Sequence, residues 1–115
     1  MMSKMNRVDT DDEGLEFDDV DLLTLYKGVP FTGEIVESDG KGNVVHLSSY
    51  RDGLQEGPEC SWYPNGRLKL EGEMKEGLPR GVWRRWDLNG RMTRESEFDD
   101  SGRRIRFWER SEEEG

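Results

Sequence analysis

Residues 50–73 read YRDGLQEGPECSWYPNGRLKLEGE, and residues 74–97 read MKEGLPRGVWRRWDLNGRMTRESE. The two stretches share glycines, a tryptophan, an Asn-Gly-Arg tripeptide and a closing apolar–acidic segment at equivalent positions, 24 residues apart. So many matches at one fixed period indicate a tandem repeat, and the weaker units at 26–49 and 98–109 are typical of the ends of a repeat array. The repeat framework consists of Gly33, Gly57, Gly81, Gly42, Gly66, Gly90, Trp62 and Trp86.

The pattern inside one unit predicts two antiparallel strands. Across 67–74, apolar residues and glycine alternate with charged residues, which is the period of a half-buried strand. Asn65-Gly66 and Asn89-Gly90 predict tight hairpin turns, because both residue types tolerate positive φ. Segments 52–57 and 76–81, each framed by two glycines, predict a second and wider loop. We therefore expect an all-β fold, an antiparallel β-meander of tandem hairpin repeats with roughly seven or eight strands.

Composition supports a thin sheet in a single domain. The chain has 115 residues, enough for one domain, with 14 glycines and no alanine. Alanine is the best helix former and glycine one of the worst, so a helical protein is disfavoured. Hydrophobic residues make up 31% of the chain, which favours one layer of aromatic side chains along a sheet over a thick core.

Charge divides the chain into three parts. The net charge is −9, but residues 1–25 hold eight acids and two bases, whereas residues 26–110 hold fifteen of each. We expect an acidic, flexible N-terminal arm at 1–19, a β-repeat domain at 20–110 and an acidic tail at 111–115. The first 25 residues do not resemble a signal peptide, and no apolar run approaches the length of a membrane span, so the sequence predicts a soluble, cytoplasmic protein.

The repeat unit resembles the MORN-repeat-like units of the bacterial YwqK-type antitoxin family. The resemblance covers about residues 26–108, including the opening Pro30–Glu34 segment. It implies a β-meander that binds and neutralises a cognate toxin protein, in the manner of an immunity protein, with the toxin encoded nearby. The matching residues are Tyr50, Gly53, Gly57, Trp62, Tyr63, Asn65, Gly66, Arg67 and Leu68, repeated by Met74, Gly77, Gly81, Trp86, Asn89, Gly90, Arg91 and Met92.

Catalytic and cofactor motifs are not evident in the sequence. His46 is the only histidine, and Cys60 is the only cysteine, so neither a disulfide within the chain nor a cysteine-based zinc site is expected. We expect His46 to be a surface or packed residue and Cys60 to pack as a small apolar residue. The glycines recur in turns and do not form a phosphate-binding loop. The sequence thus predicts a protein that is not an enzyme and has no cofactor or metal.

Residues that depart from the repeat are the candidates for partner binding. Trp83 has no aromatic counterpart one repeat earlier, and the truncated last unit adds further aromatic residues within an arginine-rich half. Tryptophan, tyrosine and arginine are enriched in interface hot spots. The acidic arm is a second candidate, because it would mimic an anionic substrate of a basic toxin. The candidates are Trp83, Arg85, Phe107, Trp108, Asp18, Asp19 and Asp21.

Several alternatives remain open at this point. The repeated tryptophans form either the packing stripe of the sheet or exposed anchors for a partner. The protein is either a dedicated antitoxin or a general protein-binding scaffold, and the Arg/Trp-rich half is also a less favoured nucleic-acid-binding surface. Net negative charge disfavours membrane binding. An open meander has two edges, which allows a homodimer.

Overall fold

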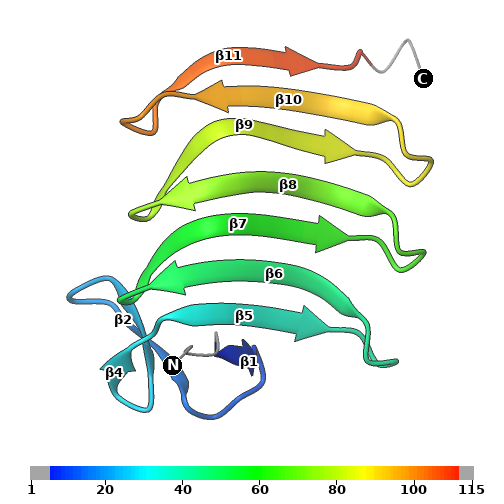
Figure 1. Cartoon of the computed structure of the whole chain (residues 1–115). Helices are drawn as coiled ribbons and strands as arrows, with labels where there is room; N and C mark the ends of the chain where they lie inside the picture. Colours follow the sequence, from blue (N-terminus) through cyan, green and yellow to red (C-terminus); the bar gives the residue numbers. More distant parts are fainter. Residues whose placement is uncertain (1–5, 112–115) are drawn as a thin grey trace, which may run out of the picture.

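The computed structural model describes residues 6–111, which form eleven strands in two sheets (Figure 1). This part of the chain contains no helix, and therefore none long and apolar enough to cross a membrane. The small sheet contains β2 (Leu15–Asp18), β3 (Leu23–Tyr26) and β4 (Val29–Pro30). The large sheet contains β1 (Arg7–Asp9), β5 (Gly33–Ser38), β6 (Val44–Arg51), β7 (Leu54–Trp62), β8 (Leu68–Lys75), β9 (Leu78–Trp86), β10 (Met92–Phe98) and β11 (Arg104–Glu109).

Strands β5 to β11 form an antiparallel meander in which each strand pairs with its neighbours in sequence. Strand β1 is the exception, because it pairs in parallel with β5 at one end of the sheet. Figure 1 shows β1 and β11 at opposite ends of the array. The all-β, mostly antiparallel architecture expected from the sequence is confirmed.

The lengths of the two kinds of turn are the reverse of those predicted from the sequence. Strands β6 and β7 are joined by two residues alone, Asp52 and Gly53, with φ of 50° and 88°. Glu76 and Gly77 join β8 and β9 with nearly the same angles, 52° and 86°. Two successive positive φ angles define the type I′ turn, which matches the twist of paired strands. The predicted wide loops are therefore wrong, because the second glycine of each pair lies inside the following strand.

The Asn-Gly sites form the longer connections instead. The backbone N–H of Tyr63 donates to the carbonyl of Arg67 at 2.8 Å, and that of Gly66 donates to the carbonyl of Tyr63 at 2.9 Å. Only the glycine of this Asn-Gly pair has positive φ, 87°. The prediction of positive φ at these sites is thus correct for Gly66 and Gly90 and wrong for the asparagines.

Aspartates stabilise the equivalent connections elsewhere in the sheet. Asp87 accepts hydrogen bonds from the backbone N–H groups of Arg91 at 3.0 Å and Asn89 at 2.9 Å. These bonds favour the carboxylate and hold the pKa of Asp87 below its usual value. Hydrogen bonds donated within their own turns lower the pKa of Asp39 and Asp99 in the same way.

The hydrophobic core lies where the small sheet packs against one end of the large sheet. Val8, Phe31 and Ile35 are buried there. Partly buried Leu15, Tyr26 and Tyr50 pack around them. The Phe31 ring lies 6.0 Å from that of Tyr26 and 6.2 Å from that of Tyr50, in tilted or edge-on arrangements typical of aromatic clusters.

This core changes the interpretation of the N-terminal arm. Residues 7–9 and 15–18, expected within a flexible arm, are strands β1 and β2, and Val8 is buried. The sequence pattern was misleading because the apolar residues that anchor this segment are few and the segment as a whole is rich in acidic residues. Residues 1–5 and 112–115 lie outside the described part, so the structure does not bear on the arm's first residues or on most of the predicted tail.

The remainder of the large sheet is a single layer. No hydrophobic side chain beyond Val36 is buried within the described chain. The radius of gyration is 15.9 Å, whereas a compact domain of this length has about 13 Å. Both faces of β7 to β11 are therefore uncovered within the described residues.

Candidate functional site: an aromatic–arginine surface

The strand register divides the large sheet into two faces, because residues directly opposite each other in antiparallel strands point to the same side. The Trp83 face carries the row Ser48, Glu59, Gly72, Trp83, Ser96 and Phe107. The Glu71 face carries the row Leu47, Cys60, Glu71, Arg84, Glu95 and Trp108.

Trp83 is held in place by small residues on both neighbouring strands. A Cβ atom at Gly72 would overlap the indole ring, so the ring lies directly over that glycine. On the other side Trp83 is paired with Ser96, which is buried. The indole Nε1–H donates to the carbonyl of Glu73 at 3.1 Å. Trp83 is thus a half-buried part of the sheet's packing that still presents an open ring surface.

A groove of about 300 Å³ lies beside Trp83. Its apolar lining comes from Leu70, Pro79, Trp83 and Phe98, on strands β8, β9 and β10. Phe98 occupies the position that Tyr50 and Met74 occupy in the earlier units. The groove also includes arginine side chains, so it combines an apolar floor with positive charge.

Three guanidinium groups surround this floor. Arg85 pairs across the strands with Leu70 and Arg94. Arg104 lies over the Phe107 ring, 4.2 Å from its centroid, and Arg94 lies 5.9 Å from the same centroid. These distances are within the range of a cation–π interaction.

Few carboxylates neutralise these arginines. Arg94 forms an ion pair with Glu109 at 2.8 Å. Within the described residues, no carboxylate lies within 4.0 Å of the guanidinium of Arg85 or Arg104. The aromatic–arginine surface, defined here as Trp83, Arg85, Arg94, Phe98, Arg104 and Phe107, therefore has a net positive charge.

The predicted binding residues fall in three different places. Trp83, Arg85 and Phe107 share the aromatic–arginine surface. Trp108 lies on the Glu71 face, opposite Glu95, with 44% of its surface exposed. The acidic candidates lie away from both, in the β2–β3 hairpin beside the β6–β7 turn (Figure 1). There Asp18 accepts the backbone N–H of Val20 at 2.9 Å, which shapes the turn, and the remaining acidic candidates, Asp19 and Asp21, are exposed.

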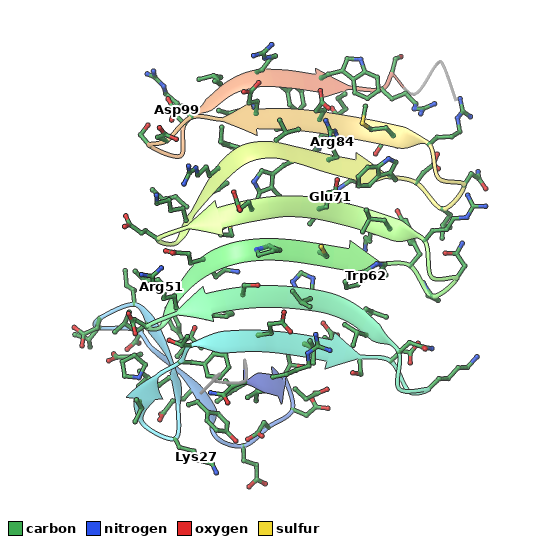
Figure 2. All side chains as sticks on the ribbon, viewed as in Figure 1. Lys27, Arg51, Trp62, Glu71, Arg84 and Asp99 are labelled. Atoms are coloured by element: carbon green, nitrogen blue, oxygen red, sulfur yellow. The ribbon has the colours of Figure 1, made fainter. Side chains whose placement is uncertain are left out.

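The Glu71 face is dominated by ion pairs. Figure 2 shows Glu71 and Arg84 on the neighbouring strands β8 and β9. Arg84 Nε lies 2.8 Å from a carboxylate oxygen of Glu95, and its Nη1 lies 4.0 Å from Glu71. Burial raises the pKa of the Cys60 thiol, and the charges of Glu71 and Glu59 raise it further. A thiol with a raised pKa is a weak nucleophile, in agreement with the expected packing role.

A polar network around His46 was not anticipated from the sequence. His46 Nδ1 lies 2.6 Å from the Ser61 hydroxyl, and Nε2 lies 3.1 Å from the Ser48 hydroxyl and 3.5 Å from Glu59 Oε2. Two groups thus share Nε2, and the carboxylate is the more distant of them, unlike the close acid–histidine contact of a nucleophilic triad. Ser48 and Gly72 are small residues that lie 24 positions apart, which is one repeat. This spacing was the signal in the sequence that small residues of successive units lie in one row across the sheet.

The framework residues occupy turns and strand ends, except Gly57 and Gly81, which lie inside β7 and β9. All six framework glycines have positive φ. Trp62 and Trp86 lie opposite Leu68 and Met92, next to the longer connections, and Trp62 is labelled at this end of β7 in Figure 2. The Tyr63 hydroxyl donates to the carbonyl of Trp86 at 2.8 Å and joins successive units.

Comparisons with protein-family models, with curated proteins and with solved structures found no match. No group of three or more histidine, cysteine, aspartate or glutamate side chains within residues 6–111 is arranged to hold a metal ion. The resemblance to MORN-like antitoxins accordingly depends on the sequence motifs alone. The fold and the site define an open, single-layer β-sheet with an uncovered aromatic and cationic face.

Proposed function

We propose that this chain is a non-catalytic binding protein that captures a partner protein on its aromatic–arginine surface. The observation that supports the proposal is the groove beside Trp83 on an uncovered part of the sheet. There an apolar floor lies beside Arg85 and Arg104, which have no carboxylate within 4.0 Å among residues 6–111. Aromatic residues and arginine are the usual anchors of protein interfaces. The partner is expected to present apolar side chains flanked by acidic ones.

The energetics of this surface favour an occupied state. Phe107 is 45% exposed, and Trp83 is half-buried and lines the groove. Removing apolar surface from water contributes about 25 cal/mol per Å². Covering the groove would also shield Arg85 and Arg104 from water, which is favourable only when a carboxylate pairs with them. The surface should therefore bind a partner with acidic side chains more tightly than a purely apolar one.

The sequence resemblance suggests which cellular role such a binding protein would have. MORN-like units of the YwqK type imply an antitoxin or immunity protein, so the partner would be a cognate toxin, blocked by steric occlusion of its active surface. The tandem MORN-like nature of the 24-residue units is part of the same proposal. A general protein-binding scaffold would use the same surface, and the presence or absence of a toxic partner separates the two.

Single-stranded nucleic acid is the second candidate ligand. Stacking aromatic rings beside arginines also describes a surface for bases and phosphates. The opposing observation is the net charge of −9, which repels a polyanion outside this one surface. We therefore favour a protein partner over single-stranded nucleic acid.

The test is an affinity capture from the native cell with matched variants. The double variant Arg85→Glu, Phe107→Ser reverses one charge and removes one ring from the aromatic–arginine surface. Arg91→Glu makes the same charge change in the exposed β9–β10 connection and serves as the control. We expect one stoichiometric partner with the parent chain and the control, and its loss with the double variant.

Toxicity then tests the antitoxin form of the proposal. A captured partner that arrests growth when expressed alone, and not when co-expressed with the parent chain, supports it. A partner retained by the double variant would refute the assigned surface. Nucleic acid that co-purifies with the parent chain and resists nuclease only when bound would support the second candidate instead.

A further inference from the structure

The longer of the two end strands in each sheet has no pairing partner on its outer side within the described residues. In the large sheet this strand is β11, which pairs only with β10. In the small sheet it is β2, which pairs only with β3. An unpaired strand edge presents a row of backbone N–H and C=O groups that can bind another strand.

The two edge strands have complementary side chains. Strand β11 reads Arg-Ile-Arg-Phe-Trp-Glu, with Ile105 52% and Phe107 45% exposed. Strand β2 reads Leu-Glu-Phe-Asp, with Phe17 61% exposed. One edge is thus basic and apolar, and the other is acidic and apolar.

We propose that β2 of one molecule pairs with β11 of a second copy of this chain. In the antiparallel register that sets Glu16 opposite Arg106, Phe17 lies opposite Ile105 and Leu15 lies opposite Phe107. Opposite-charge and apolar pairs placed directly across two strands each stabilise the pairing. Arg106 remains 75% exposed beside its own ion pair with Glu97, so its guanidinium is accessible to a further carboxylate.

Charge at longer range favours the same arrangement. Residues 1–25 have eight acids and two bases, whereas residues 103–110 have four arginines and one glutamate. The β2–β3 hairpin lies beside the β6–β7 turn, whereas β11 lies at the far end of the large sheet from β1 (Figure 1). The contact between copies is therefore head-to-tail. A head-to-tail contact that does not close into a ring produces chains of increasing length rather than a symmetric dimer.

A symmetric pairing of two β11 strands is disfavoured by the same side chains. Centred on Arg106, it would set the two copies of this arginine against each other. Centred on Phe107, it would set Arg104 against Arg110. Like charges directly opposite destabilise strand pairing.

Analytical ultracentrifugation of the whole chain tests the proposal. We expect the weight-average mass to rise with protein concentration at low salt and to fall in 0.5 M NaCl, where screening acts over about 4 Å. Arg106→Glu breaks the basic edge and Glu16→Lys breaks the acidic edge. Each variant should weaken self-association by about tenfold. Lys41→Glu, in the exposed β5–β6 connection, is the control and should behave like the parent chain.

Mixing separates the head-to-tail contact from other assemblies. Each variant keeps one intact edge that fits the intact edge of the other, and the two altered edges also carry opposite charges. The mixture of Arg106→Glu with Glu16→Lys should therefore associate more strongly than either variant alone. A parent chain that stays monomeric at every concentration would overturn the proposal, as would variants that associate like the parent. The two proposals share Arg104 and Phe107 of β11. Arg85→Glu separates them, because it alters the aromatic–arginine surface on β9, away from the β11 edge, and should leave self-association unchanged.

Discussion

Gly72 and Trp83 form a pair whose coupling can be measured. In the variant Gly72→Ala the new methyl group would occupy the position of the indole ring, and the ring must move. Overpacking of this kind costs about 1–3 kcal/mol. Displacement of the ring also breaks the Nε1–H bond to the carbonyl of Glu73, which contributes about 1 kcal/mol. We expect a total loss of about 2–4 kcal/mol in the free energy of unfolding, and a melting temperature lower by about 10 °C.

The same substitution should have the opposite sign when Trp83 is absent. In the Trp83→Ala background the ring atoms nearest to a methyl group at position 72 are gone, and alanine is better than glycine inside a strand by about 0.5–1 kcal/mol. The coupling energy of the double-mutant cycle is therefore about 3 kcal/mol. Urea unfolding of the four proteins, followed by far-ultraviolet circular dichroism, measures it. Equal effects of Gly72→Ala in both backgrounds would refute the placement of the ring over Gly72.

Three further predictions concern the turns. Gly66→Val should destabilise the protein by about 1–3 kcal/mol, because residue 66 has a φ of 87°, whereas Gly40→Val, at an open site with ordinary φ, should change stability by less than about 0.5 kcal/mol in thermal melts. Glu76→Asn should stabilise the β8–β9 turn by about 0.5 kcal/mol, since asparagine tolerates the φ of 52° better than glutamate does, and a lower melting temperature would contradict the type I′ assignment. Because the folded-state pKa values of Asp39, Asp87 and Asp99 are lowered, their contribution to stability is present above the unfolded value of 3.8 and is lost as the pH falls through the folded values. The triple Asp→Asn variant should accordingly lose less stability than the parent between about pH 4 and pH 2, and unchanged pH dependence would show that these turns do not contribute.

Sequence reasoning predicted the sheet because its signals are local. The alternation of apolar and charged residues across 67–74 and the glycines at positions 66 and 90 are patterns of residues close together in the sequence. The strands and turns form where these patterns predict them. Turn type was harder, because Asp52-Gly53 and Asn65-Gly66 carry similar signals. The difference arises from the strand register on either side, which composition does not encode.

The arrangement of the candidate site was predictable only in part, for a physical reason. Trp83 and Phe107 were identifiable because they depart from the repeat, and their two positions are 24 residues apart on one face. Trp108 is also aromatic, but it follows Phe107 directly, and successive side chains of a strand point to opposite faces of the sheet. The N-terminal core was missed because Val8 and Phe31 meet only after the chain has crossed between two sheets. Contacts between residues so far apart in the sequence cannot be predicted from the pattern of neighbouring residues.

The single-layer meander has a consequence for how this gene can change in length. Each hairpin from β6 onward is joined to its neighbours alone, and the buried apolar cluster of the described residues lies at the β1 end. Duplicating or deleting one 24-residue segment would lengthen or shorten the array by two strands while leaving that cluster intact. A chain shortened or lengthened by one such segment should therefore keep both the buried cluster at the β1 end and the β11 edge.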